Sequence, residues 1–356
     1  MQQLTRIAVR FKTFQYNKSF KWKGSAVQMI KIGLIGCGMW GRNLARNLAQ
    51  LGVLASVADR LDENAAAFSA QFGAVAQPTD AVINDPSLHG IVICSAAPSH
   101  DELAIAALKA AKHVYVEKPL SLSLAGATAI ADVAKQAGRQ VMVGHLIRYH
   151  AAFIELQSQL RGGAIGSLRH IQANRLAMGR IRNTESVLFD LCPHDLSLIL
   201  ALADSMPTTI NCAGASHMTP GVVDFLSSFL GFANGVSAGM QTSWLNPVKE
   251  HQLTVTGSAG ALVFDDTKTW PEKLTLFQDH MRPNGEHFII DRASPIALPV
   301  AEAEPLKDEM RAFIETCKSG NPAPTNIDEA LGVQKVLETM QENLIDMSLI
   351  NRKMTK

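Results

Sequence analysis

Two polar motifs in this sequence combine side chains that can bind an oxygen anion and move a proton. The first is Glu117-Lys118-Pro119, and the second is Asp190-Leu191-Cys192-Pro193-His194-Asp195. The ammonium group of Lys118 can hold a hydroxyl oxygen by a hydrogen bond. A histidine such as His194, with a pKa near working pH, can accept the hydroxyl proton. Because oxidation of an alcohol removes a hydride and a proton together, the two motifs fit that reaction.

The spacing of Asp190 and His194 would place both side chains on one face if this segment is helical. Asp190 could then orient His194 or bind a substrate hydroxyl, so the candidate catalytic residues are Lys118, His194 and Asp190. Cys192 and His194 could also suggest zinc. Metal sites need three or four converging ligands, and the other cysteines offer no partner spacing, so we expect no metal.

A glycine-rich turn offers a place for an electron acceptor. Gly36, Gly38 and Gly41 form G-x-G-x-x-G between a predicted strand and a predicted helix, which is the context that dinucleotide binding requires. Asp59 ends the next predicted strand, where a carboxylate accepts hydrogen bonds from ribose hydroxyls and repels a 2′-phosphate. This favours NAD, although Asp59 as a simple helix cap is the plainer alternative. The neighbouring Arg60 could instead serve an NADP phosphate or stack on adenine.

The elements that carry these residues fall into two patterns. Up to residue 147, short apolar runs alternate with helical stretches, which predicts a doubly wound parallel sheet. From residue 148, strand follows strand with short turns, which predicts a mainly antiparallel sheet followed by two terminal helices. The predicted fold class is α/β, an N-terminal Rossmann domain plus a C-terminal α+β domain with a large, mainly antiparallel sheet. The predicted domains are a disordered basic extension over 1–28, an NAD-binding domain over 29–147, and a substrate-binding and oligomerisation domain over 148–356.

Composition limits the partners and the compartment. Of 356 residues, 47% are hydrophobic and 18% charged, and the net charge of +1 gives no reason to expect nucleic acid or a membrane surface. No run of 18 apolar residues occurs, so we expect no membrane span. Five scattered cysteines without a C-x-x-C pair fit a reducing compartment, which predicts a cytoplasmic protein. Residues 1–28 are basic and free of acidic residues, which fits a misassigned start before Met29 or an organellar transit peptide.

The glycine-rich turn, Ala97-Pro98-Ser99-His100 and Val116-Glu117-Lys118-Pro119 together resemble the glucose-fructose oxidoreductase / inositol dehydrogenase / MocA family. In that family the lysine lies beside the nicotinamide and the substrate hydroxyl, and the histidine of D-x-x-x-H accepts the alcohol proton. The resemblance covers roughly residues 31–345 and implies NAD as the cofactor. The cofactor contacts that we expect are Gly36, Gly38, Met39, Trp40, Gly41, Asp59, Arg60, Ser95, Pro98, His100, Glu117, Lys118 and His145.

Residues 143–150, 174–182 and 193–197 resemble the nucleotide-sugar branch of this family. Its members oxidise the 3-hydroxyl of UDP-linked N-acetylated hexoses, and an aminotransferase then acts on the ketone. The resemblance implies UDP-N-acetylglucosamine as substrate, a 3-amino sugar of lipid A or another surface glycan as end product, and a homodimer or homotetramer. Three arginines between residues 175 and 182 could clamp a diphosphate, although a solvated basic loop is the plain alternative. The expected substrate contacts are Lys118, Tyr149, Asn174, Arg175, Arg180, Arg182 and His194.

The sequence departs from the broader family in two places. It lacks a Gly-Gly pair before Asp190, and Ser197 stands where an aspartate is common, which puts simple monosaccharides and inositol in doubt. UDP-N-acetylglucosaminuronate and the reverse reaction, reduction of a 3-keto nucleotide sugar, stay open. A regulator that binds NAD without catalysis also stays open, because a fold does not decide a function. A regulator would have no need of Lys118 and His194 beside an intact glycine turn, so we expect an NAD-dependent nucleotide-sugar dehydrogenase acting on CH–OH.

Overall fold

The computed structural model describes residues 29–179, 181–183 and 185–347, which form two compact units. Within these residues, the unit built on a parallel sheet comprises 29–146 and 304–334, and the unit built on a nine-stranded sheet comprises 147–303 and 335–347. The predicted extension over residues 1–28 lies outside the described residues. No helix in the described part of the chain is long and apolar enough to cross a membrane.

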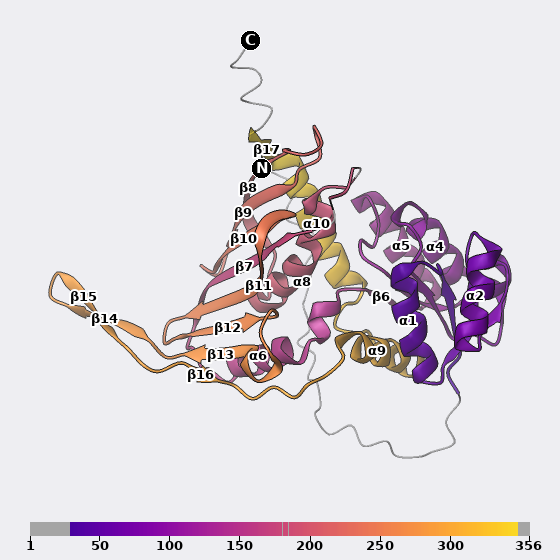
Figure 1. The fold of residues 1–356 in the computed structure, drawn as a ribbon, viewed down its shortest axis with the longest axis horizontal. Coiled ribbons are helices and arrows are strands. Elements are labelled where there is room, and N and C mark those ends of the chain that lie inside the picture. Colours follow the sequence, from indigo (N-terminus) through magenta and orange to yellow (C-terminus); the bar gives the residue numbers. More distant parts are fainter. Residues whose placement is uncertain (1–28, 180, 184, 348–356) are drawn as a thin grey trace, which may run out of the picture. The chain divides into compact units, whose positions relative to one another are not determined.

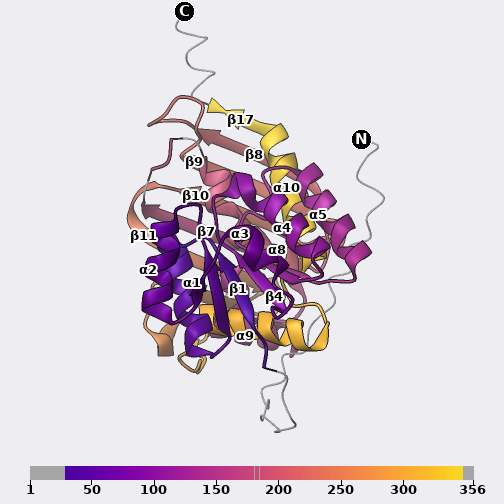
Figure 2. The ribbon, with the colours of Figure 1, turned by 90° about the vertical axis from the view of Figure 1, so that its right-hand side faces the viewer.

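The first unit is a doubly wound sheet with the strand order β3-β2-β1-β4-β5-β6, and all of its pairs are parallel (Figures 1 and 2). The order reverses between β1 and β4, which is where such sheets bind ligands at their carboxyl edge. Strands β1, β4, β5 and β6 are buried throughout, as expected for a sheet covered on both faces. The strands are β1 (Ile32–Ile35), β2 (Leu54–Ala58), β3 (Val75–Ala76), β4 (Gly90–Ile93), β5 (His113–Val116) and β6 (Val141–Val143).

Helices of this unit come from both ends of the chain. The predicted boundaries leave residues 304–334 in the second domain, but in the structure they belong to the parallel-sheet unit. The reason is the apolar face of α9, which sets Phe313 and Cys317 so close to Gly90 of β4 that a side chain there would collide with both. The helices are α1 (Met39–Gln50), α2 (Asp62–Phe72), α3 (Thr79–Asn84), α4 (His100–Lys109), α5 (Leu124–Ala137), α9 (Pro305–Ser319), the start of α10 (Ile327–Asn343) and the short η1 (Ala97–Ser99).

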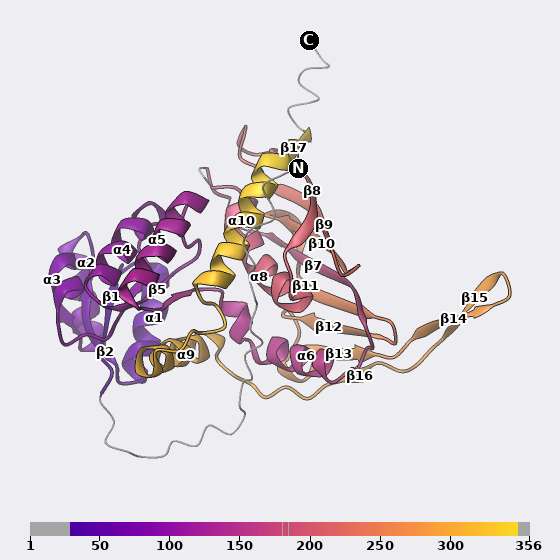
Figure 3. The same cartoon turned by 180° about the vertical axis from the view of Figure 1, so that it is seen from behind.

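The second unit is a nine-stranded sheet with the order β16-β13-β12-β11-β7-β10-β9-β8-β17. Most pairs are antiparallel, whereas β10 with β7 and β17 with β8 are parallel. Figures 1 and 3 show α6, α8 and the end of α10 along one face of this sheet, while β14 and β15 form a hairpin that extends beyond it. The strands are β7 (Leu168–Met178), β8 (Pro207–Ala215), β9 (Phe225–Phe232), β10 (Ser237–Ser243), β11 (Leu245–Gly257), β12 (Ala261–Asp265), β13 (Leu274–Phe277), β14 (His280–Asn284), β15 (His287–Asp291), β16 (Ile296–Ala297) and β17 (Leu344–Asp346). The helices are η2 (Leu146–Tyr149), α6 (Ala151–Arg161), α7 (Val187–Asp190), α8 (Cys192–Ala203) and η3 (Trp270–Glu272).

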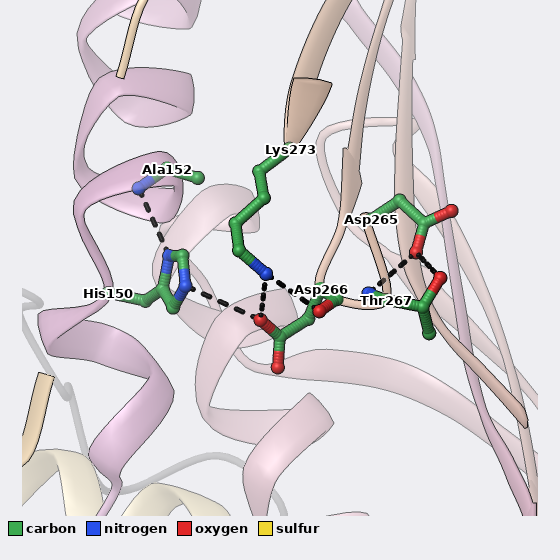
Figure 4. Close-up of polar contacts among 6 residues, drawn as sticks. All are labelled: His150, Ala152, Asp265, Asp266, Thr267 and Lys273. Carbon is green, nitrogen blue, oxygen red and sulfur yellow. Dashed lines mark hydrogen bonds and ion pairs between the residues drawn. The ribbon is translucent and has the colours of Figure 1, made fainter. Parts of the chain in front are cut away.

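A polar cluster fastens the start of α6 to the segment between β12 and β13 (Figure 4). His150 Nδ1 accepts the backbone N–H of Ala152 at 3.1 Å, so a neutral His150 carries its proton on Nε2, 3.4 Å from Asp266 Oδ1. Lys273 Nζ donates to the same carboxylate oxygen at 2.8 Å. The His150 ring stacks on Trp270 with centroids 4.9 Å apart. The cap, the contact with Asp266 and the stacking therefore share one histidine.

Burial would raise the pKa of Asp266, but the hydrogen bonds from His150 and Lys273 and the charge of Lys273 outweigh it and hold the pKa well below its usual range. A carboxyl whose pKa is lowered in the folded state stabilises the protein above its unfolded pKa of about 3.9 and loses that contribution as the pH falls. We expect Asp266→Asn to lower the melting temperature near pH 7. The gap to wild type should narrow progressively as the pH falls below about 4 toward the lowered pKa of Asp266. The exposed Asp132→Asn serves as a control with little effect. A gap that stays constant from pH 7 to pH 2.5 would contradict this assignment.

Candidate active site

The glycine-rich turn lies between β1 and α1, at the carboxyl edge of the parallel sheet. Gly36 has a φ of +108°, and a Cβ there would lie 2.6 Å from the backbone of Ser95. A Cβ at Gly41 would lie 2.1 Å from the carbonyl oxygen of Gly36. At Gly38, which begins α1 with a φ of −80°, a Cβ would meet nothing within 4 Å. Gly36 and Gly41 are therefore required by the fold itself, whereas Gly38 leaves open space in front of the helix N-terminus.

Asp59 lies at the end of β2 and joins the glycine turn to α2. Its Oδ2 accepts the backbone N–H of Cys37 at 2.6 Å, and its Oδ1 accepts the backbone N–H of Leu61 at 2.9 Å. Burial would raise the pKa of Asp59, but these hydrogen bonds and a third from Asn64 lower it overall. A charged carboxylate beside the glycine turn fits the ribose-binding role. Its hydrogen bond to the N–H of Leu61, the N-cap residue of α2, shows that Asp59 also fixes the backbone before that helix. The neighbouring Arg60 is exposed.

The loops after β4 and β6 contain two buried histidines. His100 places Nδ1 2.8 Å from the carbonyl oxygen of Pro119 and Nε2 3.1 Å from that of Ser95. Both ring nitrogens thus contact backbone, which makes His100 a brace between two loops. His145 places Nδ1 2.8 Å from Oε2 of Glu329 on α10, and both side chains are buried. The role of Glu329 is not visible in the sequence, since α10 follows β6 by more than 180 residues.

The loop after β4 also contains two of the expected cofactor contacts. The hydroxyl groups of Ser95 and Ser99 lie 2.7 Å apart, and Pro98 belongs to the short η1. At the start of α1, Met39 is 79% exposed and Trp40 is 42% exposed. Met39 and Trp40 follow β1, and Ser95 and Pro98 follow β4, at the reversal of strand order, so their placement fits the expected contacts.

The Glu-Lys-Pro motif follows β5 and is tied directly to the glycine turn. Glu117 Oε1 accepts Trp40 Nε1 at 2.5 Å and the Tyr115 hydroxyl at 2.9 Å, and its Oε2 accepts the backbone N–H of Lys118 at 3.2 Å. Desolvation of Glu117 raises its pKa, and the three hydrogen bonds oppose that rise. The peptide bond between Lys118 and Pro119 is cis, and the Lys118 side chain is half-buried. The candidate lysine and the glycine turn therefore belong to one hydrogen-bonded site.

In the nine-stranded unit, the Asp190–His194 segment is not one continuous helix. Helix α7 ends at Asp190 and α8 begins at Cys192, so the two residues do not share the single helix on which the expected common face depended. Asp190 Oδ1 accepts Arg182 Nη2 at 2.9 Å and its Oδ2 accepts Trp244 Nε1 at 3.2 Å. His194 lies half-buried in the first turn of α8. Asp190 is therefore held by an arginine and a tryptophan, and Trp244 is a contact that the sequence did not reveal.

Neighbouring side chains of the segment that contains Asn174 and Arg175 point to opposite faces of β7. Arg175 points to the helix-covered face, where its Nε and Nη2 donate to both carboxylate oxygens of buried Asp195 at 2.9 and 2.7 Å. Asn174 points to the opposite face and donates to Glu250. Asn174 and Arg175 consequently do not line one site, and Arg175 is committed to Asp195, so this geometry does not support its expected role in a diphosphate clamp. Arg180 lies outside the described residues.

Two further expected substrate contacts have different surroundings. Arg182 is 45% exposed and bridges Asp190 and Glu185. Tyr149, at the end of η2, is only 3% exposed.

A hollow of about 140 Å³ lies beside Asp190 in the nine-stranded unit. It is lined by Arg175, Ala177, Gly179, Arg182, Asp190, Leu191, Ser243, Trp244 and His251.

His251 and Cys192 bear on the protonation and metal chemistry of this region. Burial, with the nearby charges of Arg175 and Lys249, lowers the pKa of His251 to about 4, so this ring is neutral at pH 7. Burial raises the pKa of Cys192 to about 12, so this side chain is a protonated thiol at pH 7. Across the described ranges, no group of three or more His, Cys, Asp or Glu residues could hold a metal ion.

Two stretches of the chain match models of known protein families. Residues 30–145 match the family model described as the oxidoreductase family, NAD-binding Rossmann fold, and residues 153–263 match the GFO/IDH/MocA C-terminal domain. The chain belongs to the GFO/IDH/MocA oxidoreductase family. The predicted family resemblance, the fold class and NAD as the cofactor are confirmed.

Relatives within the GFO/IDH/MocA family include enzymes with different substrates. The inositol 2-dehydrogenase of Acidothermus cellulolyticus is 33% identical over 49% of this chain and 54% of its own length, so the chain spans about half of that relative. The UDP-N-acetylglucosamine 3-dehydrogenase of Acidithiobacillus ferrooxidans is 30% identical over 60% of this chain and 67% of its own length. A crystal structure of the UDP-N-acetylglucosamine 3-dehydrogenase from that species has a TM-score of 0.78 and 23% identity, covering 90% of this chain and 99% of the other, which shows the shared fold.

The open space at Gly38 gives a direct test of cofactor binding. We expect Gly38→Ala to leave the melting temperature of the NAD-free protein unchanged, because the new methyl group meets no protein atom within 4 Å. NAD binding should weaken about tenfold or more, since a methyl inserted into a close contact typically costs about 1–3 kcal/mol. Calorimetric titration with NAD measures this effect. Unchanged affinity would show that the pyrophosphate does not approach the backbone at this glycine.

Proposed function

We propose that this protein oxidises the 3-hydroxyl of UDP-N-acetylglucosamine to the 3-keto sugar, with transfer of a hydride to NAD. The observation that carries the dehydrogenase assignment is the hydrogen bond between Trp40 and Glu117, which joins the glycine turn to the Glu-Lys-Pro motif. The 30% identity to a UDP-N-acetylglucosamine 3-dehydrogenase supports the choice of substrate. An aminotransferase that consumes the ketone, in a route to a 3-amino sugar, belongs to the same proposal.

The chemistry divides between two side chains of this chain. NAD, when bound, supplies the acceptor for the hydride that leaves the carbinol carbon. Lys118 would hold the carbinol oxygen, and His194 would accept its proton as the carbon–hydrogen bond breaks. The products are then a ketone, NADH and a protonated histidine, so the electron pair and the proton are both accounted for. Asp190 would act through Arg182 and Trp244, and Arg182, which is 45% exposed, would be the cation for a substrate phosphate.

A second candidate substrate is a cyclic polyol, because an inositol 2-dehydrogenase is 33% identical over about half of the chain. UDP-N-acetylglucosaminuronate is a third, and it would need a cation for its C6 carboxylate. The same residues would also serve reduction of a 3-keto nucleotide sugar, since hydride transfer is reversible. These candidates are separated by substrate profile alone.

We expect formation of NADH with UDP-N-acetylglucosamine, measured by absorbance in the presence of an aminotransferase that traps the ketone. Lys118→Met should lower kcat about 10²–10³-fold through loss of charge stabilisation. His194→Asn should lower kcat about 10²–10⁴-fold through loss of the base. Both variants should keep the wild-type melting temperature. The exposed Lys109→Met and His217→Asn serve as matched controls with full activity.

Myo-inositol and UDP-N-acetylglucosaminuronate are assayed in parallel. Activity with the uronate or with inositol, but not with UDP-N-acetylglucosamine, would refute the proposed substrate. The proposed roles of Lys118 and His194 would still hold. Full activity of Lys118→Met would refute the mechanism. Tight NAD binding without activity on any of the three compounds would favour a regulator that binds NAD.

We also propose that the nine-stranded sheet pairs with a second copy of the chain through its face opposite α8. Phe225 and Phe229 of β9 point outward and are 38% and 48% exposed. Apolar side chains on an open sheet face are typical of protein interfaces. Phe229 is flanked on the neighbouring strands by Asn211 and Gly239, so a partner can approach it closely.

Phe229→Asp should shift the protein to monomer in light scattering coupled to size exclusion, because a buried unpaired carboxylate opposes association. Val75→Asp is the control, since Val75 is also exposed, at 57%, but lies on the parallel sheet. A wild-type monomer, or a Phe229→Asp oligomer of unchanged mass, would contradict this interface.

A further inference from the structure

A glutamate lies in the middle of the apolar face of α9. Glu309 follows the stripe formed by Leu306, Met310 and Phe313, and its side chain is fully buried. Its Oε2 lies 3.1 Å from the hydroxyl group of Tyr115 on β5. Its Oε1 is buried and has no hydrogen-bond partner among the described residues. A charged carboxylate with one unpaired oxygen would be costly at such a position, whereas a carboxylic acid is not.

The number of protons decides the direction of these hydrogen bonds. The Tyr115 hydroxyl lies 2.9 Å from Oε1 of Glu117 and 3.1 Å from Oε2 of Glu309, but it has a single proton to donate. Glu117 has two other donors, Trp40 Nε1 and the backbone N–H of Lys118, so it is the better-supported carboxylate. Tyr115 therefore donates to Glu117, and the proton between Tyr115 and Glu309 must come from Glu309.

The surroundings of Glu309 agree with this order. Burial, followed by the negative charge of Glu117, raises the pKa of Glu309 well above its usual range. Tyr115 and Glu117 are the titratable groups that act on it from β5 and its end. From α1, which also packs against α9, Arg46 and Asn47 bind Glu304 instead. Directly after β6, the position next to the Tyr115 hydroxyl is Gly144, where a Cβ would lie 2.6 Å from that oxygen.

We propose that Glu309 is a positioning residue, a neutral carboxylic acid that donates to Tyr115 so that the tyrosine can donate to Glu117. Glu117 in turn holds the Trp40 indole and the Lys118 amide, so the protonation of Glu309 sets the geometry between the glycine turn and the candidate lysine. The effect of Glu309 on Lys118 rests on the proposed function, in which Lys118 binds the substrate hydroxyl. The effect of Glu309 on Trp40 requires only that the glycine turn binds the cofactor. When Glu309 ionises at alkaline pH, two carboxylates compete for one hydroxyl proton, and the order is lost.

The matched variants are Glu309→Gln, which stays neutral and can donate to Tyr115 through its amide, and Glu309→Leu, which cannot donate. We expect Glu309→Gln to bind NADH as wild type does at pH 7 and to keep that affinity at alkaline pH, where wild type weakens. Glu309→Leu and Tyr115→Phe should each bind NADH about tenfold more weakly, as for loss of a hydrogen bond to a charged group. The double variant should be no weaker than either, because both substitutions break one chain. NADH fluorescence gives these affinities without any substrate.

Two further measurements address protonation directly. Infrared difference spectra of wild type against Glu309→Gln at pH 7 should show the C=O stretching band of a protonated carboxylic acid in wild type. A raised pKa also means that the folded state keeps a proton that the unfolded state releases above about pH 4.3, so wild-type stability should fall relative to Glu309→Gln as the pH rises. Absence of that band, or equal NADH affinity of wild type, Glu309→Leu and Tyr115→Phe, would overturn the proposal. Inactivity on every sugar with this NADH pattern intact would refute only the proposed function.

Discussion

The carboxylate of Glu117 is the contact on which the cofactor-binding unit depends. It receives hydrogen bonds from Trp40 at the start of α1, from Tyr115 in the core of β5, and from the Lys118 amide. Three donors from two segments of the chain fix a side chain that desolvation alone would tend to neutralise. The glycine turn and the Glu-Lys-Pro motif are far apart in the sequence, and this one group makes them a single site. Glu309 extends the same network to the other end of the chain.

In the nine-stranded unit the corresponding role belongs to the buried pair of Arg175 and Asp195. The bidentate contact joins β7 to the first turn of α8, where His194 also lies. Loss of one partner from such a pair typically costs about 3–5 kcal/mol, because the remaining charge stays buried and unpaired. The pair therefore fixes the start of α8, and the residue that seemed suited to a substrate phosphate proves to be part of the scaffold. Asp190 is fixed separately, by Arg182 and Trp244.

Local patterns predicted the alternating strands and helices up to residue 147 and the successive strands from residue 148, and the structure contains both sets of elements. Their apolar periodicity and their terminal glycines are properties of neighbouring residues, so no tertiary information was needed. The sequence did not reveal that Leu191 separates two helices between Asp190 and His194.

The sequence by itself determined the cofactor turn, the Glu-Lys-Pro motif, the order of the two sheets and the family. Each of these rests on residue types at fixed short spacings, which constrain the backbone locally. Only the tertiary structure decided that residues 304–334 pack with the parallel sheet, and that Asn174 and Arg175 point to opposite faces of β7. It alone brought Glu309 within reach of Tyr115, 194 residues away. Glu309 interrupts an apolar helical stripe, which marks it as unusual, but a buried proton acquires its role from groups that only folding brings together.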